Sequence, residues 1–137
     1  MKYNLHHIGY LVKSIDKYRK TALENLLEIK EYSKITEDPI QKVKVQFAKL
    51  NDSTYIELVE PVGKDSPLFK TLKDRGEGIY HLCYEVDNID QCLEELQEKR
   101  CLVIQNPVHA AAFDNRRISF IFTRNKDLIE LLEKKSG

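Results

Sequence analysis

Residues 7–16 read His7-Ile8-Gly9-Tyr10-Leu11-Val12-Lys13-Ser14-Ile15-Asp16, and this pattern returns 74 residues later. The second copy reads His81-Leu82-Cys83-Tyr84-Glu85-Val86-Asp87-Asn88-Ile89-Asp90, with His, Tyr, Val, Ile and Asp at the same relative positions. A second pair of segments, 73 residues apart, reads Ile56-Glu57-Leu58-Val59-Glu60 and Ile129-Glu130-Leu131-Leu132-Glu133. Because two separate segments repeat at nearly one offset, the sequence indicates a duplicated module.

Hydrophobic spacing predicts the same element order, β-α-β-β-β, in both copies. For the first copy it predicts a strand over 4–12, a helix over 15–27 and strands over 28–34, 43–47 and 54–60. For the second copy it predicts a strand over 79–86, a helix over 89–99 and strands over 101–105, 116–123 and 127–133. Residues 36–39 and 106–115 are expected to be a turn and a loop. We therefore expect one α+β domain over 1–137, with modules 4–60 and 78–133. The linker, 61–77, should hold about one helical turn at 68–73.

The composition excludes several classes of protein. The 22 basic residues balance the 22 acidic ones, so no basic surface for nucleic acid is expected. No apolar run approaches the roughly 20 residues that span a bilayer, and the N-terminus lacks a signal core. We therefore expect a cytoplasmic protein without membrane contact. The three cysteines, an odd number, are expected to be reduced.

Each module carries one histidine near its start and one glutamate near its end. These four residues are His7, Glu57, His81 and Glu130. By strand alternation Glu130 shares a face with two leucines, where a carboxylate is costly unless it is paired or binds a metal. If a pseudo-twofold axis relates the modules, the four side chains meet at one centre.

Imidazole and carboxylate together hold a divalent transition metal well. The repeat therefore predicts one such ion, whether zinc, cobalt, nickel, manganese or iron. A lone strand histidine is more often an ordinary hydrogen-bonded residue. His6 and His109 have no counterpart in the repeat, so neither is expected to bind the metal.

The sequence resembles the vicinal oxygen chelate superfamily, in its glyoxalase I and methylmalonyl-CoA epimerase branch. Four motifs carry the resemblance: His-His-Ile-Gly at 6–9, Ile-Glu-Leu-Val-Glu-Pro at 56–61, Gly-Ile-Tyr-His-Leu-Cys-Tyr-Glu-Val-Asp at 78–87 and Leu-Ile-Glu-Leu at 128–131. The resemblance implies a curled mixed sheet that forms a cup with the helices outside. It also implies that His7, Glu57, His81 and Glu130 are the metal ligands, and that the chain forms a homodimer.

Two departures from the epimerase pattern concern the substrate. The glycine-rich stretch of the epimerases is replaced here by Ala110-Ala111-Ala112-Phe113-Asp114-Asn115, although Arg117 matches their arginine. On the strand over 43–47 the residues expected to face inward are Lys44 and Gln46, where some epimerases have an acidic base. We expect Gln46, Arg117 and Ser119 to face the substrate, with Arg117, Ser119 and Ile121 on the concave face. The sequence does not identify the general base; Gln46 and Lys44 are candidates for a catalytic role.

The resemblance implies a metal-dependent isomerase or lyase that abstracts a proton next to a carbonyl polarised by the metal. The substrate would be a small molecule, such as a thioester or another anionic carbonyl compound. Two alternatives stay open. One is a resistance-type protein that binds a small molecule without turnover. The other is an extradiol dioxygenase, which fits poorly because such enzymes use two histidines and one glutamate.

Overall fold

The computed structural model describes residues 2–135. Of these, residues 8–80 form one compact unit, and residues 2–7 with 81–135 form a second. We call them the first unit and the second unit. The strands β1 (Asn4–Leu11) and β5 (Gly78–Val86) each have residues in both units. This division therefore differs from the module bounds predicted from the repeat, which stay a prediction.

The first unit has the strand order β2-β3-β4-β1. Its other elements are α1 (Ile15–Tyr18), the π-helix η1 (Arg19–Glu24), β2 (Thr36–Asp38), β3 (Val43–Lys49), β4 (Tyr55–Pro61) and α2 (Pro67–Arg75). One face of the β3–β4 pair packs against α1 through Ala48, Leu58 and Ile15. The opposite face packs against α2 through Val45, Val59 and Leu72. Both faces of this strand pair are therefore covered within the unit.

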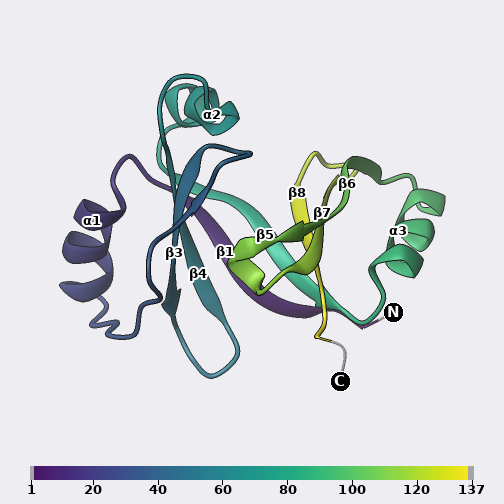
Figure 1. The fold of residues 1–137 in the computed structure, drawn as a ribbon, viewed down its shortest axis with the longest axis horizontal. Coiled ribbons are helices and arrows are strands. Elements are labelled where there is room, and N and C mark those ends of the chain that lie inside the picture. Colours follow the sequence, from purple (N-terminus) through teal and green to yellow (C-terminus); the bar gives the residue numbers. More distant parts are fainter. Residues whose placement is uncertain (1, 136–137) are drawn as a thin grey trace. The chain divides into compact units, whose positions relative to one another are not determined.

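The second unit has the strand order β1-β5-β8-β7-β6. Its other elements are α3 (Ile89–Glu98), β6 (Leu102–Ala110), the 3-10 turn η2 (Ala111–Phe113), β7 (Arg116–Phe122) and β8 (Leu128–Glu133). The sheet is mixed, because β5 and β8 run parallel while β6, β7 and β8 pair antiparallel. Helix α3 lies beside β6, β7 and β8 (Figure 1) and covers Ile121 and Leu131.

The predicted order β-α-β-β-β is confirmed in both copies. The same kind of capping contact begins both helices. The side chains of Ser14 and Asn88 accept a hydrogen bond from the backbone N–H three residues later, which is the usual N-cap contact. Glu60 and Glu133, which end the repeated segments, accept the backbone N–H of the first helical residue at 2.8 and 3.1 Å. Each module thus ties its last strand to the start of its own helix.

Five predicted elements differ from the structure. No strand spans 28–34, and the second strand of the first copy is β2, over residues for which a turn was expected. The first helix ends at Glu24 instead of residue 27, and Leu26 beyond it is exposed. In the second copy, β6 continues to Ala110, through part of the predicted loop. The linker forms nine residues of helix, because Ser66 caps α2, Pro67 begins it and Gly76 ends it at a φ of 80°.

Candidate metal centre

Three of the four repeated residues converge inside the second unit. His7 Nε2 lies 3.1 Å from His81 Nε2 and 3.0 Å from Glu130 Oε1, and His81 Nε2 lies 3.1 Å from the same oxygen. The three side chains come from β1, β5 and β8. All three are buried, with at most 3% of each residue exposed. Two imidazoles and one carboxylate therefore direct one atom each at a common point.

Strand register brings His81 and Glu130 together. In the parallel β5–β8 pair, Cys83 lies opposite Glu130, and residues opposite each other point to the same face. His81 precedes Cys83 by two residues and therefore shares that face. On the other side of β8, Phe120 lies opposite Glu130, and its ring meets the ring of His81 edge-on at 5.8 Å.

The carboxyl group of Glu130 is held in its ionised form. Burial by itself raises the pKa of a carboxyl group, but hydrogen bonds from His7 and His81 outweigh burial and lower the pKa of Glu130 below its usual range. Hydrophobic rings shield the site on one side, because Phe113 stacks on His7 with ring centroids 5.7 Å apart and planes 10° apart. Phe113 belongs to the stretch that replaces the glycines of the epimerases.

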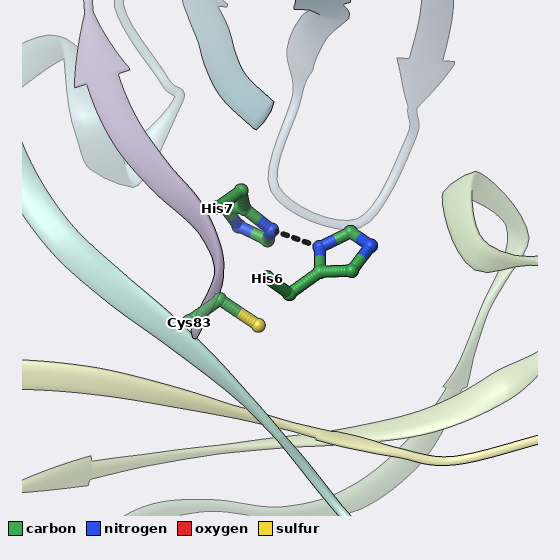
Figure 2. Close-up of side chains that lie close together, drawn as sticks. All are labelled: His6, His7 and Cys83. Atoms are coloured by element: carbon green, nitrogen blue, oxygen red, sulfur yellow. Dashed lines mark hydrogen bonds between the residues drawn. The ribbon is translucent and has the colours of Figure 1, made fainter. Parts of the chain in front are cut away.

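The second nitrogen of His7 contacts another histidine. His6 Nδ1 lies 2.8 Å from His7 Nδ1, as the dashed line in Figure 2 shows. Burial, and after it the charge of His7, lowers the pKa of His6 to about 4, so His6 is neutral near pH 7. Figure 2 shows Cys83 beside the two rings, and ligand atoms of all three residues lie within 4.8 Å of one another. The repeat did not point to His6, because the residue 74 positions later is Tyr80, and strand alternation would place His6 on the face opposite to His7.

Glu57 lies on β4 in the first unit, opposite Phe47 on β3. Only 6% of this residue is exposed. It shares the strand face of Val45 and Val59, so it is a second buried carboxylate on an apolar face. Its role as a metal ligand stays a prediction that rests on the repeat.

Lys44 and Gln46 do not lie on the strand face that carries Glu57. Gln46 lies opposite Leu58, whose side chain packs under α1. Its amide accepts a hydrogen bond from Arg19 at 3.1 Å and donates one to the carbonyl oxygen of Ser33 at 2.8 Å. The prediction that Lys44 and Gln46 face inward is wrong, because the register of β3 places Val43, Val45 and Phe47 on that face instead.

Arg117 and Ser119 also lie on the helix side of their strand. Ile121, on the same face of β7, packs against α3. Arg117 donates to both carboxylate oxygens of Glu133, at 3.0 and 2.9 Å, and to Asp90 at 2.9 Å. Ser119 is fully buried and donates to the carbonyl oxygen of Gln105 at 2.6 Å. The predicted concave placement of Arg117, Ser119 and Ile121 is therefore wrong.

A different arginine lies on the face of β7 that carries Phe120. By alternation this residue is Arg116, which donates to Glu85 at 2.8 Å. Glu85 shares the β5 face of His81 and Cys83, and the Arg116–Glu85 pair is half-buried. The sequence carried the signal, since Arg116 and Arg117 are adjacent and only one of them can face the histidines.

The donor set fits a divalent transition metal. Separations of 3.0 and 3.1 Å match the roughly 3 Å between adjacent ligand atoms that each lie about 2.0–2.2 Å from one ion. A buried, ionised carboxylate and two imidazole nitrogens are the ligand types that zinc and its neighbours accept. His7, His81 and Glu130 can therefore hold such an ion.

A family model described as Glyoxalase/Bleomycin resistance protein/Dioxygenase superfamily matches residues 6–120. The chain belongs to this superfamily. It is 32% identical over 133 residues to the uncharacterized protein YqjC of Bacillus subtilis, covering 96% of this chain and 92% of that one. It is 31% identical over 132 residues to the mitochondrial methylmalonyl-CoA epimerase of Homo sapiens, covering 93% of this chain and 72% of that one.

Solved structures agree with the predicted fold class. The hypothetical protein BH1468 of Bacillus halodurans has a TM-score of 0.88 and 31% identity, covering 100% of this chain and 98% of that one. The methylmalonyl-CoA epimerase of Mycobacterium tuberculosis has a TM-score of 0.83 and 24% identity, covering 96% and 88%, which is a likeness of fold. The glyoxalase-type fold is thereby confirmed. Among residues 2–135, every helix is too short or too polar to span a bilayer.

Proposed function

We propose that this chain is a divalent-metal-dependent isomerase of the epimerase type, acting on the C–H bond next to the carbonyl of an acyl thioester. The observation that carries the proposal is the convergence of His7 Nε2, His81 Nε2 and Glu130 Oε1 within 3.0–3.1 Å. Such a site is suited to a metal that activates a carbonyl compound. The curated relatives named methylmalonyl-CoA epimerase support this reaction class over a glyoxalase-type lyase.

The proposal gives His7, His81 and Glu130 the role of holding the ion, with Glu57 as a fourth ligand. Glu57 occupies the same place in the first repeated segment as Glu130 does in the second. When bound, a divalent ion acts as a Lewis acid on a carbonyl group and makes the adjacent C–H bond more acidic. With an ion bound, His7 and His81 would turn the lone pairs of their Nε2 atoms to it, the lowered pKa keeps Glu130 ionised, and Phe113 and Phe120 lie against the imidazole rings.

The relatives suggest an acyl thioester as the substrate, and residues 110–115 bear on the shape of its acyl group. One structural neighbour was solved in complex with methylmalonyl-CoA. In this chain, residues 110–115 place the Phe113 ring on His7, where the epimerases have glycines. We therefore expect an acyl thioester whose acyl group differs in shape from methylmalonyl, and weak turnover of methylmalonyl-CoA itself. The homodimer and the cytoplasmic location stay predictions.

Hydrogen exchange with deuterated water tests the proposal. Purified protein loaded with cobalt is incubated with a panel of acyl-CoA compounds that includes methylmalonyl-CoA. At least one of these compounds should gain deuterium at the carbon next to its carbonyl group. Exchange should stop when a chelator removes the ion and return when cobalt is restored. Glu130→Gln should abolish it, whereas Glu94→Gln, a matched change of an exposed residue on α3, should leave it unchanged.

Two outcomes would contradict the proposed function. Exchange that continues at full rate after chelation would show that the metal is not needed. A thioester or other small molecule that binds tightly without any exchange, in the presence of metal, would favour the non-catalytic binding protein instead.

A further inference from the structure

His7 is contacted at both ring nitrogens. Its Nε2 lies at the convergence point with His81 and Glu130, and its Nδ1 lies 2.8 Å from Nδ1 of His6. The rings of His6 and His7 are nearly perpendicular, with planes 80° apart. Phe113 contacts both rings, stacking on His7 and meeting His6 edge-on at 5.7 Å. His6 and Phe113 therefore hold the His7 ring in addition to its contacts with His81 and Glu130.

A contact between two Nδ1 atoms at this distance requires one proton, held by one ring and accepted by the other. If Nε2 of His7 uses its lone pair to bind a metal, the proton of the neutral ring must be on Nδ1. His7 then donates and His6 accepts, so the proton of His6 must be on Nε2. One hydrogen bond thus determines the tautomers of both residues.

We propose that His6 is a positioning residue for the metal centre, which accepts the Nδ1–H of His7 and thereby directs Nε2 of His7 toward the ion. The inference rests on the proposed metal-binding function. Histidine ligands in metal sites almost always donate their second nitrogen to a fixed acceptor, usually a carboxylate or a carbonyl. Here the acceptor is the neighbouring residue of the same strand, and it is an imidazole.

Cys83 makes a different arrangement conceivable, and the experiment must separate the two. Ligand atoms of His6, His7 and Cys83 lie within 4.8 Å of one another. In that arrangement an ion would bind the Nδ1 atoms and the thiolate, and His7 would turn its other nitrogen away from that ion. Two observations favour the His7–His6 hydrogen bond over an ion at the thiolate. The two Nδ1 atoms lie 2.8 Å apart, and Nε2 of His7 points to Glu130.

The test compares three variants with the wild-type protein in cobalt titrations. His6→Phe keeps an aromatic ring against Phe113 but removes the acceptor. His6→Asn keeps an acceptor oxygen. His109→Phe is the matched control, because His109 is exposed and its Nδ1 contacts the carbonyl oxygen of Asn115, away from the three converging side chains. We expect His6→Phe to weaken cobalt binding by roughly 10–100-fold. His6→Asn should recover a large part of that loss, and the control should bind within about twofold of wild type.

Long-range proton–nitrogen NMR of the zinc-loaded protein provides the second measurement, which needs only the wild type. We expect His7 to carry its proton on Nδ1 and His6 on Nε2. His6→Phe with wild-type affinity would overturn the inference while leaving the proposed function intact. So would a His7 proton on Nε2, or an intense thiolate-to-cobalt band that Cys83→Ser removes. Wild-type protein that binds no divalent ion would overturn both proposals.

Discussion

Glu130 shows how single residues acquire their properties at this site. It is a carboxylate with 2% of its surface exposed, and its neighbours in sequence on the strand are apolar. Its ionised form is stabilised because two imidazoles contact the same oxygen. If either imidazole is removed, the buried carboxylate of Glu130 loses one of its two imidazole partners. A buried charge with fewer partners lowers the stability of the folded protein. The same contacts that stabilise the carboxylate gather the ligand atoms for a metal.

Histidine 81 is predicted to be essential for metal binding. Substitution by alanine removes one of the three converging atoms, whereas loss of an outer-shell partner alone costs roughly 10–100-fold in affinity. We therefore expect His81→Ala to lose more than that in isothermal titration with zinc. His109→Ala, a change of an exposed histidine, should bind zinc like the wild type. Equal affinities for the two variants would contradict the assignment.

Arg117 is predicted to act on stability. It makes a two-point contact with Glu133 and a further one with Asp90, and 30% of its side chain is exposed. For a partly exposed network of this kind we expect Arg117→Ala to lower the free energy of unfolding by about 1 kcal/mol in urea titrations. Lys49→Ala, which removes an exposed ion pair 3.7 Å long, should change it very little. If Arg117→Ala has the same free energy of unfolding as the wild type, the contacts of Arg117 with Glu133 and Asp90 do not stabilise the protein.

Glu133 gives a related prediction for pH. The hydrogen bond from Arg117, followed by the backbone N–H of Ile89, lowers the pKa of Glu133 against the opposing effect of burial. A pKa that is lowered in the folded state stabilises the protein at pH values above the pKa of the unfolded chain, which is about 4.3. This stabilisation is lost as the pH falls through the pKa of the folded state. Glu133→Gln should therefore be less stable than wild type near about pH 6, and the difference should shrink below about pH 4. A difference that stays constant over this range would contradict the assignment.

At the scale of elements, the repeated segments use their two glutamates differently. The first glutamate of each segment, Glu57 or Glu130, is buried on a strand, and the second, Glu60 or Glu133, accepts the N–H that begins the helix of its own module.

The elements that the sequence predicted wrongly have local causes. β2 has three residues and shows no alternating hydrophobic pattern, and the first helix widens into a π-helix, with bonds such as Asn25 N–H to Lys20 O.

The linker helix α2 depends on its cap. Ser66 is buried, accepts the N–H of Leu68 at 3.3 Å and donates to the carbonyl oxygen of Gln41 at 2.8 Å. Loss of a serine N-cap typically costs about 1 kcal/mol, so Ser66→Ala should lower the free energy of unfolding by at least that amount. Ser53→Ala, in the exposed turn before β4, should cost less than about 0.5 kcal/mol. Chemical denaturation of both variants measures the difference, and equal effects would show that α2 does not depend on this cap.

At the scale of the whole molecule, the four proposed ligands are divided between the two units. His7, His81 and Glu130 belong to the second unit, whereas Glu57 belongs to the first. An ion bound by all four would stabilise the complete fold, because a ligand that binds only the folded state stabilises it by mass action.

Metal binding should therefore raise the melting temperature in a way that depends on Glu57. At about 100 times the dissociation constant, an ion adds about 2.7 kcal/mol to the free energy of unfolding. We expect this rise in scanning calorimetry of the wild type, and a much smaller rise at the same ion concentration for Glu57→Ala. Glu37→Ala, an exposed change on β2, should respond like the wild type. If Glu57→Ala keeps the full rise, the fourth ligand is not Glu57.

The sequence by itself determined the duplicated β-α-β-β-β order, because strand and helix spacing are local and the repeat marks equivalent positions. It also identified the three residues that converge in the second unit, since buried histidine and glutamate on apolar strand faces need partners. Tertiary structure alone decided which way each side chain points. The register of β3 and β7 put Gln46 and Arg117 under the helices, and the folded chain placed Nδ1 of His6 against Nδ1 of His7. Strand alternation leaves two possible faces for every residue, and only pairing with neighbouring strands selects between them.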